Sequence, residues 1–170
     1  MKNLNKEVVS IFNFRAYLIP ILLTSFLILG VITLVNQLFK SNAEEIDFIK
    51  FWLPLLFSLV FFLGIVHEFR NKIINLKISK SSIVKRTYLG INKTYYLKDF
   101  DGFSIRTEKG KIESYEYLYL LKDGEPIITI AQTYIGNYYE LKNMISSNSK
   151  NLGVSNYGLF NEIVDIICLK

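Results

Sequence analysis

Four cationic side chains lie close together between residues 77 and 86. They are Lys77, Lys80, Lys85 and Arg86. Cationic side chains close to an anionic membrane leaflet contribute about 1 kcal/mol of attraction each, so a cluster of this kind is suited to anionic lipid headgroups. A plainer interpretation is that these charges only retain the following part of the chain on one side of a membrane. The sequence leaves both interpretations open, and we treat these four residues as the candidate headgroup site.

Residues suited to catalysis or to metal binding are sparse. His67 is the only histidine and Cys168 the only cysteine, so a Ser-His-Asp triad or a zinc site is not expected. His67 stands beside Glu68 at the edge of an apolar segment, where we interpret it as a membrane-interface residue. None of the nine glycines forms a phosphate-binding loop pattern. The sequence therefore predicts a protein that is not an enzyme and that uses neither a cofactor nor a metal.

An Asp-x-Asp pair is the one pattern that resembles part of a metal site. It consists of Asp99 and Asp101. A calcium loop needs further oxygen ligands at alternate positions, and Phe103 and Ile105 occupy the next two. The pattern is therefore interpreted as a turn that leads into a strand.

Apolar and charged residues are segregated along the chain. Of its 170 residues, 51% are hydrophobic and 21% are charged, which favours a membrane part followed by a water-facing part. The net charge of +5 and the interleaved basic and aromatic residues at 85–88 and 93–96 also admit a nucleic-acid interpretation. Tyrosine is common in strands, and a membrane-tethered domain has little access to nucleic acid, so nucleic acid is not an expected partner.

Two apolar segments are predicted to cross a membrane. Residues 16–39 contain no Asp, Glu, Lys, Arg or His. At about 1.5 Å per residue they would span about 36 Å as a helix, enough for a hydrocarbon core of about 30 Å. Residues 51–66 form a shorter segment that needs residues 67–69 to span. A buried core helix is the alternative for this second segment.

The distribution of charges predicts the orientation of this hairpin. Three basic residues lie within 1–15 and six within 70–86, whereas the connecting residues 40–50 hold two basic and three acidic ones. The positive-inside rule therefore places both termini in the cytoplasm, as in a multi-pass protein of the inner (cytoplasmic) membrane. A signal peptide cleaved near residues 41–43 is the alternative for the first segment.

After residue 69 the apolar residues recur at alternate positions, as is typical of β-strands, instead of with the period of a helix. The predicted strands are 73–80, 83–89, 93–97, 102–107, 112–121 and 126–131, joined by tight turns that favour antiparallel pairing. A helix is predicted over 134–146, with Asn137 as its cap and Glu140 completing a capping box. Residues 159–169 are predicted to form a short helix or an added strand.

This order of elements resembles that of a pleckstrin-homology-like domain. The segments that carry the resemblance are LKISKSSIVKRTYLGINKTYYLKDFDGFSI and ITIAQTYIGNYYELKNMI. A two-helix hairpin before such a domain resembles small bacterial membrane proteins. The resemblance implies a bent sandwich or partly open barrel, one end of which is closed by the apolar face of the C-terminal helix. The side chains of that face would be Tyr138, Leu141 and Ile145.

The predicted fold class is therefore an α+β membrane protein with a two-helix transmembrane hairpin, then a small antiparallel β-sandwich or barrel capped by a helix. The predicted divisions are an N-terminus at 1–15, a first transmembrane helix at 16–39, a loop at 40–50, a second transmembrane helix at 51–69, a β-rich domain at 70–147 and an extension at 148–170.

The expected function is that of a non-enzymatic, membrane-anchored binding or scaffold module. The expected partners are membrane lipids, a partner membrane protein or further copies of this chain. A nucleotide-sensing, ligand-gated membrane effector and a membrane immunity protein are the alternatives, because both share this topology.

Overall fold

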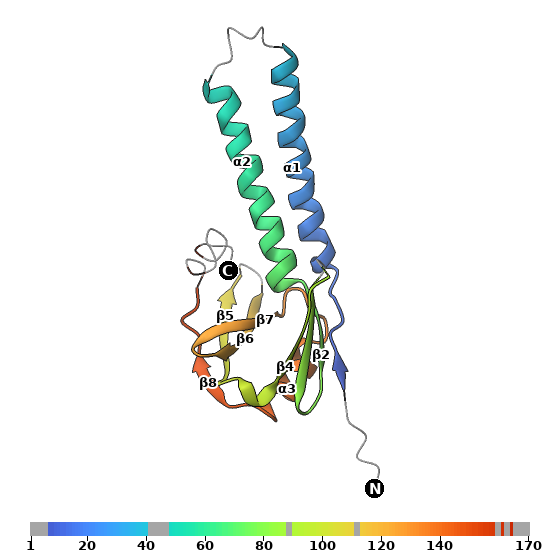
Figure 1. The fold of residues 1–170 in the computed structure, drawn as a ribbon, viewed down its shortest axis with the longest axis vertical. Coiled ribbons are helices and arrows are strands. Elements are labelled where there is room, and N and C mark those ends of the chain that lie inside the picture. Colours follow the sequence, from blue (N-terminus) through green and yellow to red (C-terminus); the bar gives the residue numbers. More distant parts are fainter. Residues whose placement is uncertain are drawn as a thin grey trace.

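Two long helices project as an antiparallel pair from a β-rich domain (Figure 1). The structure is a computed structural model that describes residues 7–40, 48–87, 90–110, 113–158, 161 and 164. The helices are α1 (Arg15–Lys40) and α2 (Phe48–His67). Both meet the domain at the same end of the pair (Figure 1). The chain therefore leaves the domain through α1 and returns to it through α2.

Both helices are long and apolar enough to cross a membrane. Only 11% and 12% of their most apolar windows are buried, whereas the core helix of a soluble protein would be mostly buried. The helices pack on each other through a stacked pair of rings, Phe26 and Phe61, with centroids 5.6 Å apart. Gly30 faces Ser58 so closely that a Cβ atom at position 30 would clash with the Ser58 Oγ. A glycine at this position thus permits the close approach of the two helices.

The second helix continues past its last apolar residue. A π-helical turn, η1 (Glu68–Lys72), extends α2, and Ile73 alone separates it from the first long strand. Such turns are rare and are found frequently at functional sites. In this chain η1 contacts strands of both sheets, so it joins the hairpin directly to the domain.

The domain contains two four-stranded sheets. The first has the order β1 (Val8–Val9), β2 (Ile74–Ile78), β3 (Ser82–Thr87) and β4 (Asn92–Tyr96). The second has the order β7 (Glu125–Ala131), β6 (Ser114–Lys122), β5 (Gly102–Lys109) and β8 (Asn151–Val154). A short 3₁₀ helix, η2 (Leu97–Asp99), connects the two sheets. All neighbouring strands are antiparallel except β5 and β8, which are parallel.

The first strand precedes the helical hairpin in sequence. Val8 lies opposite Ile78 of β2, so the sheet is assembled from both sides of the hairpin. The segment that follows is held by backbone hydrogen bonds from Asn13 to the Tyr134 carbonyl at 2.7 Å and from Gly136 to the Ile11 carbonyl at 2.7 Å. The start of α1 is therefore attached to the domain independently of α2.

One core joins the two sheets to the remaining helix, α3 (Tyr138–Ser146). The three side chains predicted for its inner face, Tyr138, Leu141 and Ile145, are at most 1% exposed. This helix contacts β1 and β2, and its Lys142 forms an ion pair with Glu116 of β6 at 2.6 Å. The prediction of an apolar inner face on this helix is confirmed.

The six strands expected from the sequence are present with small shifts at their ends, and residues 88, 89 and 112 of the predicted strands lie outside the described residues. The turn interpretation of the Asp-x-Asp pair is also consistent with the structure, since Asp101 accepts a hydrogen bond from the Gly124 backbone N–H at 2.9 Å. The second apolar helix begins at Phe48, within the stretch predicted as the loop 40–50. The element predicted at 159–169 lies outside the described residues, apart from Asn161 and Val164.

Two predictions about the last helix are wrong. The helix begins at Tyr138 rather than at residue 134, because residues 134–137 form a turn in which Ile135 bridges to Phe12. Asn137 is the N-cap residue of this helix, as predicted, but the capping box is absent, since its side chain forms no capping hydrogen bond. Its carbonyl oxygen instead accepts from the Ile11 N–H, and its amide donates to the Val9 carbonyl, both at 2.8 Å. This asparagine thus fastens the N-terminal strand, a partner that local sequence could not indicate.

Candidate anion-binding site

A cavity of about 480 Å³ lies between the two sheets at the foot of α2. Three parts of the chain form its walls. The end of α2 and η1 contribute His67, Arg70, Asn71 and Lys72; the first sheet contributes Lys85, Thr87, Lys93 and Tyr95; and the second sheet with the segment after β8 contributes Tyr119, Glu125, Pro126, Ile127, Thr129 and Tyr157. Ile91 completes the lining. Four of these side chains are cationic, and one is a carboxylate.

The register of the first sheet places Lys85 directly opposite Lys93. Side chains that face each other across antiparallel strands have Cβ atoms about 4.5–5.5 Å apart. On β3, Lys85 lies between Ile83 and Thr87, which are buried, so it belongs to the inner face of the sheet. Like charges in this arrangement repel each other, and an anion between them would remove the repulsion.

Burial and these neighbours change the acidity of Lys85. Loss of hydration, together with the nearby charges of Lys93 and Arg70, lowers the pKa of its ammonium to about 8, and loss of hydration is the largest of these causes. Its Nζ donates to the backbone carbonyl of Ile127 on β7 at 3.3 Å, and it thus reaches from the first sheet to the second. A carbonyl neutralises no charge, so this hydrogen bond leaves the charge of the Lys85 ammonium in place.

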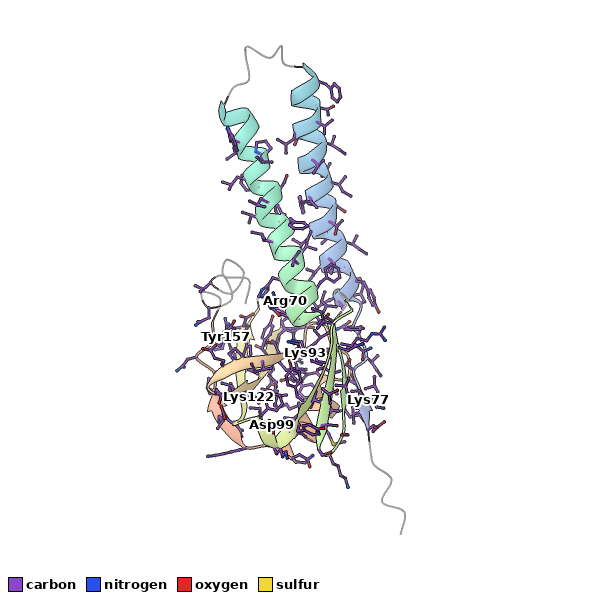
Figure 2. The ribbon with its side chains drawn as sticks, viewed as in Figure 1. Arg70, Lys77, Lys93, Asp99, Lys122 and Tyr157 are labelled. Carbon is purple, nitrogen blue, oxygen red and sulfur yellow. The ribbon has the colours of Figure 1, made fainter. Side chains whose placement is uncertain are left out.

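The wall formed by η1 supplies the other two cations. Arg70 lies at the foot of α2, and Lys93 lies just below it (Figure 2). The side chain of Lys72 lies over the ring of Tyr117 at 5.9 Å. Asn71 and His67, one turn apart, approach within 3.2 Å through the Asn71 amide nitrogen and the His67 Nδ1. The end of the apolar helix is therefore itself a wall of the basic cavity.

The opposite wall is aromatic and includes the segment that follows β8. The rings of Tyr119 and Tyr157 pack with their centroids 5.2 Å apart. Arg106 of β5 donates to the Tyr157 carbonyl at 3.1 Å, which fixes this segment against the second sheet. Part of the predicted extension 148–170 thus completes the cavity.

The structure separates the four cations of the predicted headgroup site. Lys85 alone lines the cavity. Lys77 forms an ion pair with Glu7 at 2.8 Å on the outer side of the first sheet, away from Lys93 (Figure 2). Lys80 is exposed in the turn between β2 and β3, and Arg86 is exposed on the outer face of β3.

Sequence reasoning missed three of the cations that do meet in the cavity, namely Arg70, Lys72 and Lys93. From the sequence, membrane topology explains the first two, and the third is interpreted as a strand residue and as part of the basic and aromatic segment 93–96. The sequence does contain one signal of this cavity: Lys85 occupies an inner position in the alternation of Ile83, Lys85 and Thr87 along the strand. A charge at such a position indicates a polar cavity or a partner.

No protein-family model matches the chain, and no curated protein or solved structure matches it significantly. A function for this chain therefore has to be inferred from its own residues and geometry.

Proposed function

We propose that this protein is a non-enzymatic, membrane-anchored binding module whose basic cavity takes a phosphate group at the membrane surface. The observation that carries the proposal is the pair Lys85 and Lys93 on the inner face of one sheet, facing a third cation, Arg70, at the foot of α2. Three cations that converge on one cavity favour a ligand with more than one negative charge. A phosphate monoester has this charge, and lysine and arginine both bind its oxygens.

The hairpin supports the membrane part of the proposal. Two aromatic side chains near opposite ends of α1, Tyr17 and Phe39, are 53% and 87% exposed, as expected for residues at the two membrane interfaces. The 22-residue separation corresponds to about 33 Å of helix, which is close to the thickness of a hydrocarbon core. The basic residues that flank the hairpin on the domain side favour the cytoplasmic face for the domain.

The cavity then lies at the depth of the lipid headgroups. Only Ile73 stands between η1 and β2, and the next residue, Ile74, pairs with Thr87 of the cavity wall. The wall of the cavity thus begins at the level where the apolar helix ends. Each cation close to an anionic leaflet contributes about 1 kcal/mol of attraction. An anionic lipid of that leaflet is therefore the source of phosphate that we propose.

A pleckstrin-homology-like architecture is part of the same proposal. Two packed sheets and a helix whose Tyr138, Leu141 and Ile145 enter the core support it. An N-terminal strand that precedes the membrane hairpin adds a feature that the resemblance does not include. Since one architecture serves many ligands, the cavity rather than the fold supports the choice of a phosphate ligand.

A ligand-gated membrane effector is the second candidate function. The observation that favours it is the polar cavity between the sheets, one wall of which belongs to the apolar hairpin. In that case the phosphate would belong to a soluble ligand such as a nucleotide. The chemistry at Lys85 and Lys93 is the same for both sources, so an experiment has to distinguish them.

Native mass spectrometry of the full-length protein released from nanodiscs would make this distinction. Nanodiscs of phosphatidylcholine alone would be compared with discs that also contain phosphatidic acid or phosphatidylglycerol, and with choline-lipid discs to which AMP is added. We expect one phosphatidic acid molecule to be retained in preference to the other lipids. Retention of AMP but of no anionic lipid would support the effector, and retention of neither would contradict both proposals.

A further inference from the structure

We infer that the cavity is coupled to the membrane hairpin, so that binding of a phosphate ligand changes the position of α2 relative to α1. This inference rests on the proposed function, because it needs the cavity to bind an anion. It goes further by giving the bound ligand an effect on the membrane-spanning part of the protein. The inference depends on how differently the two helices are attached to the domain.

The first helix is attached without any contribution from the cavity. Arg15, at its start, forms a hydrogen bond with the hydroxyl of Tyr115 and an ion pair with Glu113 at 3.6 Å. Ala16, in its first turn, is 2% exposed and belongs to the core of the domain. The backbone bonds of the segment before it add to this attachment. None of these α1 contacts involves a residue that lines the cavity.

The second helix is attached through the wall of the cavity. His67 ends α2, and Arg70, Asn71 and Lys72 belong to the π-helical turn that continues it; all four line the cavity. The facing wall, Lys85 and Lys93, belongs to the first sheet. An anion between the two walls would therefore contact the membrane helix on one side and the β domain on the other.

This arrangement gives the ligand different affinities for different positions of α2. When the η1 wall lies close to the first sheet, a bound anion is attracted by the cations of both walls. When α2 moves away, the anion is attracted only by the cations of the sheet. The attraction falls with distance, so binding favours the closed position. A ligand shifts a conformational equilibrium only through such a difference, and the shift is reciprocal: a change in the hairpin would alter the affinity of the cavity.

A distance measured between the far ends of the two helices would report this change. Cys168 is replaced by serine, and spin labels are attached to V35C on α1 and L53C on α2, two positions that are 41% and 52% exposed. Double electron–electron resonance is then recorded on full-length protein in phosphatidylcholine nanodiscs with and without phosphatidic acid. We expect phosphatidic acid to change the mean distance between the two spin labels by more than the width of the distance distribution.

Two variants separate ligand binding from the general charge of the membrane. Lys85→Gln removes a cation from the cavity, whereas Arg86→Gln removes the neighbouring cation from the outer face of the same strand. We expect the displacement to disappear in the first variant and to persist in the second. An unchanged distance in a sample that retains one phosphatidic acid by native mass spectrometry would overturn the coupling and leave the proposed function standing. A sample that retains no phosphate ligand would overturn the proposed function itself.

Discussion

Lys85 and Lys93 face each other across two antiparallel strands on the inner face of the first sheet. Two ammonium groups in this position weaken the pairing of the strands that carry them. A further cation, Arg70, approaches from the end of the apolar helix α2, and among the described residues that line the same cavity Glu125 is the one carboxylate. The arrangement opposes folding and favours anion binding, which is the usual signature of a binding site rather than of a structural core.

Anion binding should weaken as the pH rises through 8. The pKa of Lys85 is lowered to about 8, so between pH 7 and pH 9 this side chain changes from mostly protonated to mostly neutral. An anion prefers the protonated form, so its affinity decreases over this interval. The check is a titration of phosphatidic acid retention against pH. Lys85→Arg keeps its charge throughout and should flatten the profile, and a profile that stays equally steep in this variant would contradict the assignment.

Asn137 should control the attachment of the N-terminal strand. Asn137→Ala removes two hydrogen bonds to the backbone of Val9 and Ile11, each worth about 0.5–1.5 kcal/mol. We expect faster amide hydrogen exchange in residues 8–11 and unchanged exchange in β5 and β6. Asn148→Ala is the control, because that residue lies just past the C-terminal end of α3 and its side chain bonds back to Met144 rather than to the N-terminal strand. Equal rates of amide hydrogen exchange in residues 8–11 of the two variants would show that the Asn137 side chain does not hold the N-terminal strand.

The strands and the two apolar helices could be predicted because their signals are local. Alternation in residues 112–121 and the length of residues 16–39 are visible within a short window. The strand Val8–Val9 has only two residues, and its partner β2 lies on the other side of the hairpin, so no local pattern indicates it. The attachment of the N-terminal strand by the Asn137 side chain was missed for the same reason, since the two backbone groups that it binds there lie more than 120 positions away.

The candidate site was only partly predictable because the register of strands decides it. Proximity in sequence grouped Lys85 with Arg86, yet neighbours on a strand point to opposite faces. Pairing across strands brings Lys85 to Lys93 instead, and η1 adds Arg70 from the end of a helix. Neither relationship appears in the linear spacing of basic residues.

The contact between Gly30 and Ser58 should set the spacing of the hairpin. Gly30→Ala is expected to be tolerated, because the Ser58 hydroxyl can rotate away from an added methyl group. Gly30→Leu would force the helices apart at an overpacking cost of about 1–3 kcal/mol. Gly64→Leu is the matched control, since a Cβ atom at that glycine has no neighbour within 4 Å. The midpoint temperature of thermal unfolding in nanodiscs should be lowered by Gly30→Leu and not by Gly64→Leu. Equal decreases in both variants would contradict a close contact of the helices at Gly30.

The most direct test of the central claim is the affinity of Lys85→Gln and Arg86→Gln for phosphatidic acid in nanodiscs. The two variants lose the same charge from adjacent positions of β3, one on the cavity side and one on the outer side. A charged hydrogen bond is worth about 1.5–3 kcal/mol, so we predict that Lys85→Gln weakens retention roughly 10- to 100-fold, whereas Arg86→Gln weakens it only a few-fold. Equal losses in the two variants would show that the domain responds to the charge of the leaflet as a whole and that the cavity is not a phosphate site.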